Sequence, residues 1–466
     1  MSTDFPTLAP RYDVVIVGAG PAGIFAALEL VRQGVTDVLM LEKGKSIERR
    51  SCPAKQHGCI HCATCAIMTG WGGAGAFSDG KLTLTSHVGG WLGDYIEPEP
   101  LDTLLEYADE LWLEYGSTHE VHGPDAETAA RLVADAEDAG MTLVPMRVRH
   151  LGTERSPLVR SAMRESLEAA GVTVRTDAPV AAFVQDEGRI TGVRLSDGST
   201  VGAGAVIAAP GREGADWLAA QARLLELPLV TNAVDIGVRG ECEARIMEPL
   251  TDPLYEAKLL YRTPTFGDDV RTFCMNPYGE VTCESYDDIV TANGHSFADS
   301  RTANTNFAVL VSQRFTEPFH EPITYGESVA RLANLLGDGI LVQRLGDLAH
   351  GRRSTPERIA KGKVQPTMPS AAPGDLSFVL PYRHLTAILE FLDAMDALAP
   401  GLQGPDTLLY GVEVKFYSSR LGLDRDLMTR IDGLFAVGDG AGVTRGLLQS
   451  SASGVHAARA ARAMLG

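Results

Sequence analysis

The hydrophobic pattern at the start of the chain predicts a strand, a tight turn, a helix and a second strand. Residues 12–17 end in a β-branched run that is typical of a buried strand, and residues 24–34 have the spacing of a helix. The apolar run at residues 37–41 predicts another short strand, which ends at Glu42. This order indicates a parallel α/β unit.

A second region, residues 171–211, alternates apolar and polar positions. Asp186-Glu187-Gly188 and Asp197-Gly198 are turn signals that separate its strands. We therefore predict a three-stranded β-meander within residues 171–209, followed by the turn Pro210-Gly211. Helical spacing recurs in four further segments: 102–115, 125–140, 156–170 and 214–225.

The pattern changes between residues 229 and 402, where short strand-like segments predominate. They are residues 234–239, 257–262, 271–275 and 280–285, with helical spacing at 328–336 and 384–399. We predict an α+β domain with an antiparallel sheet, inserted between two parts of an α/β domain. The predicted boundaries are 1–228 and 403–466 for the α/β domain and 229–402 for the insert.

Composition narrows the class of protein. The chain has 466 residues, 45% of them hydrophobic, and a formal net charge of −19, which describes a folded globular protein and argues against nucleic acid and anionic membrane as partners. The N-terminus lacks the pattern of a signal peptide, and no run approaches the roughly 18–20 apolar residues that span a bilayer. We expect a cytoplasmic protein without a membrane span.

The turn after the first predicted strand contains Gly18, Gly20 and Gly23, spaced as GxGxxG. Gly18 permits a tight turn, Gly20 lets the backbone approach a diphosphate, and Gly23 lets the helix pack closely on the sheet. The helix N-terminus, which includes Ala22, offers N–H groups and a partial positive charge to phosphates. Glu42 stands where an acidic residue accepts hydrogen bonds from an adenosine ribose. The segment therefore predicts a dinucleotide site.

Residues 433–442 repeat this order near the C-terminus, with a short apolar strand, a glycine-rich turn and a helix from about Leu447. With the meander between them, the two motifs resemble those of FAD-dependent oxidoreductases of the glutathione-reductase structural type. The resemblance implies a Rossmann-like FAD-binding domain and an inserted substrate domain. It also implies that Asp439 binds the ribityl chain and that the last helix directs its N-terminus at the flavin pyrimidine. The full predicted FAD site comprises Gly18, Gly20, Ala22, Gly23, Glu42, Gly211, Gly438, Asp439, Gly446 and Gln449.

The glycine run at residues 70–75 has two interpretations. Its residues permit a backbone folded tightly against a flat object, and the resemblance places such a segment beside the isoalloxazine ring. The alternative is a flexible loop held by turn glycines. This run, the following SDGKL and residues 304–315 are similar to a group of bacterial FAD-dependent dehydrogenases of largely undefined substrate. A second GxGxxG after a strand is absent, so we expect NAD(P)H to act only as a transient reductant, if at all.

Four of the seven cysteines crowd into one segment, at Cys52, Cys59, Cys62 and Cys65. Their spacing suits the ligands of an iron–sulfur cluster or a zinc ion. A second interpretation is thiol–disulfide chemistry, although the C-x4-C pair of the flavin disulfide reductases is absent. A third is a set of unrelated free thiols in a loop.

Several polar residues are candidates for roles near the flavin. The candidates for the reaction are Lys81, Arg445, Cys62 and Cys65, and further polar residues expected near the flavin are Asp79, His87, His295 and Arg301. A cluster at His350, Arg352 and Arg353 suits either an anion site or a plain charged surface. In flavin chemistry the cofactor carries out hydride transfer while the protein orients and polarises the substrate. A prominent side-chain base is therefore not required.

These features predict an FAD-dependent oxidoreductase that moves a hydride or an electron pair between a small or carrier-bound organic substrate and the flavin. One alternative is an electron-transfer or thiol-redox flavoprotein that relays electrons through Cys52–Cys65 to a redox partner protein. Others are a flavin monooxygenase, a reductase of activated double bonds, and a protein that uses FAD structurally. The domain-sized insert favours an enzyme with a substrate.

Overall fold

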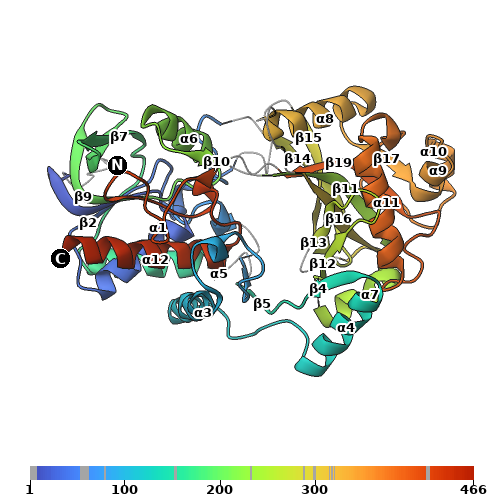
Figure 1. The fold of residues 1–466 in the computed structure, drawn as a ribbon, viewed down its shortest axis with the longest axis horizontal. Helices are drawn as coiled ribbons and strands as arrows, with labels where there is room; N and C mark the ends of the chain where they lie inside the picture. Colours follow the sequence, from blue (N-terminus) through green and yellow to red (C-terminus); the bar gives the residue numbers. More distant parts are fainter. Residues whose placement is uncertain are drawn as a thin grey trace. The chain divides into compact units, whose positions relative to one another are not determined.

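The chain folds into two compact units, drawn in Figure 1. The computed structural model describes residues 8–52, 62–77, 80–151, 155–230, 233–254, 256–286, 289–296, 301–313, 315, 319, 321–415 and 420–466. Unit 1 comprises residues 1–121, 147–231 and 418–466, and unit 2 comprises residues 122–146 and 232–417.

Unit 1 is built on a seven-stranded sheet in the order β6-β2-β1-β9-β8-β7, with β21 paired to β9. The parallel part consists of β1 (Arg11–Val17), β2 (Val38–Leu41), β6 (Thr173–Arg175), β9 (Thr200–Ala208) and β21 (Leu434–Ala436). Val15 pairs with Leu39 on one side and with Val206 on the other, and all three are fully buried. A central strand that is buried on both faces explains the uninterrupted apolar run in the sequence.

The predicted meander is confirmed. It consists of β7 (Val180–Asp186), β8 (Arg189–Leu195) and β9, which pair antiparallel in that order. Glu187 and Gly188 both adopt positive φ, of 47° and 79°, in the two-residue turn between β7 and β8. Such a turn matches the twist of the two strands that it connects.

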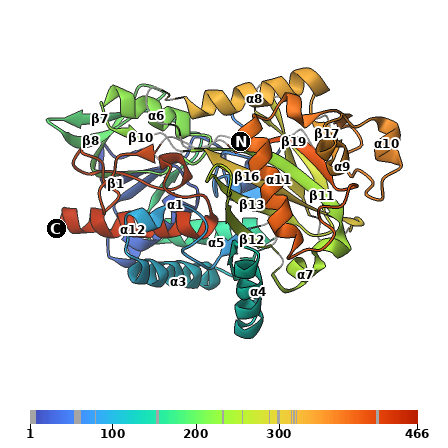
Figure 2. The same cartoon turned by 45° about the vertical axis from the view of Figure 1, so that its right-hand side comes forward.

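The helices of unit 1 are α1 (Pro21–Arg32), α3 (Pro98–Glu114), α5 (Arg155–Ala169), α6 (Ala215–Leu224) and α12 (Leu447–Leu465). Helices α1 and α12 pack on the seven-stranded sheet, α3 packs on α12, and α5 packs on α1. Helices α1 and α12 lie side by side in both views (Figure 1, Figure 2). A Cβ on Gly454 would lie 2.0 Å from the Ala22 carbonyl oxygen, so the two helices approach closely only because this residue is glycine. Short strand pairs join β3 (Lys81–Thr83) to β5 (Val148–His150) and β10 (Leu229–Val230) to β20 (Arg420–Leu421).

Unit 2 contains an eight-stranded, mostly antiparallel sheet in the order β18-β17-β19-β11-β16-β13-β12-β4. Its strands are β4 (Met141–Val144), β11 (Val234–Glu243), β12 (Lys258–Arg262), β13 (Asp269–Asn276), β16 (Asn304–Gln313), β17 (Leu341–Arg344), β18 (Ala372–Pro373) and β19 (Leu408–Lys415). The hairpin β14 (Glu280–Tyr286) and β15 (Ile289–His295) forms a separate two-stranded sheet. The helices are α4 (Ala126–Asp138), α7 (Ala244–Leu254), α8 (Pro322–Gly337), α9 (Leu345–Ala349), α10 (Pro356–Ala360) and α11 (Tyr382–Asp396).

The two faces of this sheet differ in chemistry. Ile236 and Val238 of β11 join a hydrophobic core that includes Phe391 of α11. Asp235 and Arg239 alternate with them along the strand, so they lie on the opposite face, and both are buried. The unit therefore carries buried charges on one face of its sheet.

The unit boundaries differ from the predicted ones in two places. Residues 122–146, with α4 and β4, belong to unit 2, because β4 pairs with β12. Strand β19 also belongs to unit 2, where it pairs with β11 and β17, whereas the predicted boundary assigned residues 403–417 to the flavin domain. In both cases strand pairing across a long stretch of sequence decides the boundary. Among the described residues, no helix combines the length and apolar character needed to cross a membrane.

Candidate functional site

The turn after β1 has the geometry that GxGxxG predicts. Gly18 adopts a φ of +105°, and a Cβ on it would lie 2.1 Å from the Ala209 carbonyl oxygen. A Cβ on Gly23 would lie 2.0 Å from the Gly18 carbonyl oxygen. A Cβ on Gly20 would meet only the Gly73 Cα, at 4.0 Å. Gly18 and Gly23 are thus required by packing, whereas Gly20 leaves the backbone open to a ligand.

Two helix N-termini in unit 1, those of α1 and α12, are uncapped in the sense that they have neither a side-chain cap nor an acidic residue in the first turn. Helix α1 follows Gly20 and begins with Pro21, and α12 follows Gly446. Helices α3 and α6 also have no side-chain cap, but they carry Glu99 and Asp216 in their first turns. Helix α4 of unit 2 shows the usual arrangement, since the Asp125 side chain accepts a hydrogen bond from the Thr128 N–H. N–H groups at an uncapped helix start, with the positive end of the helix dipole, suit an anionic ligand.

Glu42 holds three loops together. Its carboxylate accepts hydrogen bonds from the backbone N–H groups of Ala19 (2.9 Å), Gly44 (2.8 Å) and Gly70 (3.0 Å), and the residue is buried. A carboxylate that accepts several N–H groups fixes the backbone around it strongly. The structure thus gives Glu42 a role in shaping the site; its contact with an adenosine ribose stays a prediction.

The glycine run, residues 70–75, is anchored by backbone hydrogen bonds and close packing. The Trp71 N–H donates to the Lys45 carbonyl (2.9 Å), the Gly72 N–H donates to the Ala19 carbonyl (2.8 Å), and the Trp71 indole is fully buried. A Cβ on Gly73 would lie 3.0 Å from the Gly20 Cα, and one on Gly75 would lie 2.5 Å from the Leu447 side chain. The run therefore contacts both uncapped helix starts.

Two buried arginines flank this run, and the sequence analysis did not identify either of them. Arg50 donates to the carbonyls of Ala66, Ile67, Trp71 and Gly73 at 2.7–2.9 Å, and burial lowers its pKa to about 10. Arg160 in α5 has no exposed surface, and burial, with the nearby charge of Arg50, lowers its pKa to about 9. The sequence feature that could have pointed to Arg160 is its position on one face of α5. The other residues of that face are all buried: Ser156, Val159, Met163 and Leu167.

The structure brings together the segments of Asp439 and Gly211, two residues of the predicted FAD site. A Cβ on Gly440 would lie 2.4 Å from the Gly211 carbonyl oxygen. The Asp439 carboxylate accepts hydrogen bonds from Arg212 Nε (2.8 Å) and Thr444 Oγ1 (2.7 Å). Gly211 itself, at a φ of +68°, has no atom within 4 Å of its Cβ position, so the backbone there is open.

The start of α12 is tied to residues 86–91. Gln449 Nε2 donates to the carbonyls of Ser86 and Val88, both at 3.0 Å, and the Arg445 N–H donates to the Gly89 carbonyl at 2.7 Å. The Arg445 guanidinium lies over the Trp91 ring, 5.2 Å from its centroid. His87 in the same segment is exposed, and Lys81 is half-buried in β3. Arg445 and Gln449 are therefore held at the helix start where the sequence expected them.

The cysteine segment is described only in part. Cys52 and Cys65 are half-buried and Cys62 is exposed, whereas Cys59 and Asp79 lie outside the described residues. In the described part of the chain, no group of three His, Cys, Asp or Glu side chains is arranged to hold a metal ion. The metal interpretation and the catalytic roles of Cys62 and Cys65 stay predictions.

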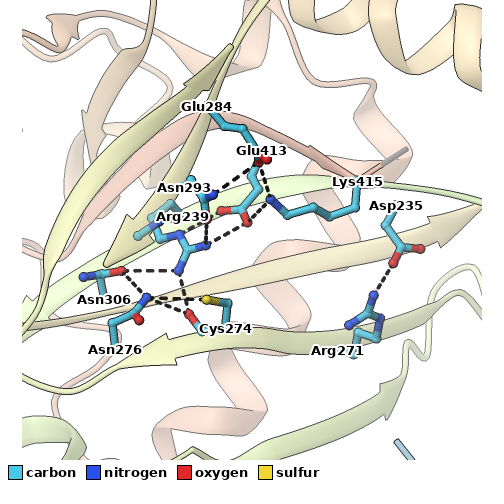
Figure 3. Close-up of polar contacts among 11 residues, drawn as sticks. Asp235, Arg239, Arg271, Cys274, Asn276, Glu284, Asn293, Asn306, Glu413 and Lys415 are labelled. Atoms are coloured by element: carbon cyan, nitrogen blue, oxygen red, sulfur yellow. Dashed lines mark hydrogen bonds and ion pairs between the residues drawn. The ribbon is translucent and has the colours of Figure 1, made fainter. Parts of the chain in front are cut away.

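Unit 2 contains its own buried polar cluster, shown in Figure 3. Arg239 Nη2 and Nε contact the two Glu413 carboxylate oxygens at 2.7 and 2.8 Å, and Arg239 Nη1 donates to the Cys274 carbonyl at 2.7 Å. Lys415 Nζ lies 3.3 Å from both Glu413 and Glu284. The charges of this cluster compensate one another.

The other polar candidates lie elsewhere in unit 2. His295 ends β15 and is exposed, and the exposed Arg301 lies over the Tyr278 ring, 4.9 Å from its centroid. In the His350 cluster Arg352 pairs with the buried carboxylate of Asp347 at 2.9 Å, and the cluster has the character of a charged surface.

Comparison with known protein families gives two matches. Residues 13–315 match the model of a family described as FAD dependent oxidoreductase. Residues 251–416 match a family described as FAD-dependent protein, C-terminal domain-like.

The individual proteins that resemble this chain share low sequence identity with it. An uncharacterized protein of Clostridium beijerinckii is 25% identical over 472 residues, which cover 95% of this chain and 79% of that protein. The 3-ketosteroid-delta4-(5alpha)-dehydrogenase of Rhodococcus jostii is 15% identical, with a TM-score of 0.46 and coverage of 99% of this chain and 98% of that chain. The L-amino acid deaminase of Proteus vulgaris is 14% identical, with a TM-score of 0.39 and coverage of 97% and 94%.

Proposed function

The chain belongs to the FAD-dependent oxidoreductase family, and we propose that it transfers a hydride or an electron pair between a small or carrier-bound organic substrate and the flavin. When bound, FAD supplies a ring that takes up or releases a hydride. The observation that carries the proposal is the glycine run, which contacts the uncapped starts of both α1 and α12. One elongated anionic cofactor would use both helix starts together.

The residues present fit this cofactor. Gly20 and Ala22 would receive the diphosphate at the start of α1, and Glu42 would hold the loops around the adenosine end. Gly211, Gly438 and Asp439 would line the ribityl chain, where the backbone at Gly211 is open. Gly446 and Gln449 would face the flavin at the start of α12. The buried Gln449 Oε1 has no hydrogen-bond partner among the described residues, which leaves an acceptor for a bound group.

Unit 2 is the proposed substrate domain. Its sheet has an apolar face that packs on α11 and an opposite face that carries buried charged side chains. A substrate site typically combines apolar surface with a small number of fixed polar groups that orient the ligand through hydrogen bonds. We propose that this face selects the substrate.

The cofactor contacts are tested with Asp439→Ala. The variant should purify with little flavin, because it removes the carboxylate proposed to bind the ribityl chain and also releases Arg212 and Thr444. Asp426→Ala is the control, because Asp426 is exposed in the same unit. Flavin per protein is measured from the visible spectrum. A full flavin complement in Asp439→Ala would exclude this role for Asp439.

The reaction is tested with an anaerobic spectrum and metal analysis of the purified protein. Reduction of bound flavin by an organic substrate supports the dehydrogenase. Rapid reduction by NADPH alone, followed by substrate-dependent oxygen consumption, would indicate a monooxygenase instead. A second chromophore that bleaches with the flavin, together with iron or zinc, would indicate electron transfer through Cys52–Cys65.

A cytoplasmic location, a redox partner protein and transient reduction by NAD(P)H stay predictions of the sequence.

A further inference from the structure

Arg160 in α5 is a fully buried cation without an anionic partner among the described residues. Its Nη1 donates to the Ser156 carbonyl at 2.9 Å and to the Ser156 hydroxyl. Its Nε and Nη2 are buried and have no hydrogen-bond partner in the part of the chain that the structure describes. The guanidinium also lies over the Trp112 ring, 5.1 Å from its centroid. Neither a serine nor an aromatic ring supplies the full negative charge that would compensate it.

The two unpartnered nitrogens form one edge of the guanidinium. Nε and Nη2 are the pair that donates side by side to two oxygens of a phosphate or carboxylate. Both lie against the glycine run, because a Cβ on Gly72 would be 3.0 Å from Nε and one on Gly75 would be 3.1 Å from Nη2. The same run contacts Gly20 through Gly73. The unpartnered edge therefore lies one short backbone segment away from the start of α1.

A buried charge without a partner destabilises the folded state, because the charge has lost its hydration. The pKa of Arg160, lowered to about 9 mainly by burial, still leaves the group protonated at neutral pH. This destabilisation is therefore present in the protein without cofactor and would be offset when an anion binds nearby.

We propose that Arg160 supplies the counter-charge for the diphosphate of FAD, acting from the side of the glycine run that faces α5. This inference rests on the proposed FAD site and adds a positioning residue to it. The role is electrostatic, and it makes FAD binding stronger than the helix starts and glycine turns alone would.

The proposal predicts effects of opposite sign with and without FAD. Arg160→Met keeps most of the side-chain volume and removes the charge. The apoprotein of this variant should unfold at the same temperature as the wild-type apoprotein or higher, because an uncompensated buried charge is gone. Its Kd for FAD should rise about tenfold or more, the effect of losing one charged interaction with a phosphate.

The experiment measures apoprotein Tm and the Kd values for FAD and for ADP on the full-length chain. Arg160→Lys keeps the charge and should lie between wild type and Arg160→Met. Arg164→Met is the matched control, because Arg164 lies on the same helix and over the Trp71 ring but pairs with Glu168 at 2.9 Å. Its Kd values should stay within about twofold of wild type, as for an exposed ion pair.

Three outcomes would overturn the proposal. A less stable Arg160→Met apoprotein with an unchanged Kd for FAD would show a purely structural role. A weaker Kd for FAD with an unchanged Kd for ADP would move the contact from the diphosphate to the flavin. Equal Kd values for Arg160→Lys and Arg160→Met would exclude a charge effect. A wild-type chain that binds no FAD would contradict the proposed function as a whole. Normal FAD binding by Arg160→Met would contradict only the role proposed for Arg160.

Discussion

Arg239 in unit 2 and Arg160 in unit 1 are both fully buried, yet their surroundings differ completely. Arg239 contacts both oxygens of Glu413 and donates to a backbone carbonyl and an asparagine (Figure 3). Burial acts to lower the pKa of Arg239, but the charge of Glu413 outweighs it and raises that pKa. At Arg160 burial prevails, because Ser156 is the hydrogen-bond partner and no carboxylate is present among the described residues.

The two units differ in what compensates their buried charges. The buried charges of the unit 2 cluster satisfy one another, so that cluster needs no ligand to be stable. Unit 1 has a buried cation, two uncapped helix starts and open backbone at Gly20 and Gly211. All of these favour an anionic, elongated ligand, which FAD supplies.

We expect the largest loss of stability from Arg239→Met, which removes the cation of the buried pair in unit 2. Removal of Arg239 leaves the buried Glu413 with Lys415, 3.3 Å away, as its remaining cation, and takes away both close contacts with the guanidinium. We expect a loss of about 3–5 kcal/mol of unfolding free energy in urea. The double variant Arg239→Met/Glu413→Leu should regain much of this loss, because neither charge is then stranded. A loss below about 1 kcal/mol in the single variant would contradict the view that unit 2 depends on its own pairing.

His384 of α11 is another buried basic group, but unlike Arg160 and Arg239 it can lose its charge. Neither ring nitrogen has a hydrogen-bond partner among the described residues, and burial lowers its pKa from 6.5 to about 4. The unfolded chain binds this proton more readily between these two values, so stability falls as the pH falls from 6.5 to 4. The expected loss is about 3 kcal/mol.

This loss is isolated by comparing wild type with His384→Phe. Unfolding free energies are measured in urea between pH 7 and pH 4, and the wild type should lose more than the variant over that range. Parallel pH profiles would show that His384 is not the group responsible.

Gly454→Ala tests the close packing of α12 against α1 in unit 1, without any change of charge. Alanine usually stabilises a helix relative to glycine, but here its Cβ would lie 2.0 Å from the Ala22 carbonyl oxygen. We expect a net loss of about 1–3 kcal/mol and weaker FAD binding, as α12 moves away from α1. A gain in Tm would mean that the two helices are not closely packed at this point.

The local structure of the two glycine-rich motifs could be predicted because each motif is one short, contiguous segment. Gly18, Gly20 and Gly23 are fixed by one turn, and the strand before them and the helix after them are each a single hydrophobic pattern. The start of the last helix at Leu447 was likewise predicted from spacing alone. The meander followed from turn residues that require positive φ.

Other features depend on contacts that local patterns do not contain. Helix α7 was not predicted because Pro249 and Pro253 lie inside it, where proline normally ends a helix. Strand β19 was assigned to the wrong side of a boundary because its partners, β11 and β17, are distant in sequence. Arg160 looks like any helix-surface arginine until the burial of its helix face is known.

Amide hydrogen exchange of the apoprotein with and without FAD tests most directly whether FAD completes unit 1. We expect FAD to slow exchange at residues 18–24, 70–77 and 438–450 of unit 1 and to leave exchange in strands β11 and β13 of unit 2 unchanged. Exchange that stays the same in those unit 1 segments, or protection confined to unit 2, would contradict the claim that FAD completes unit 1.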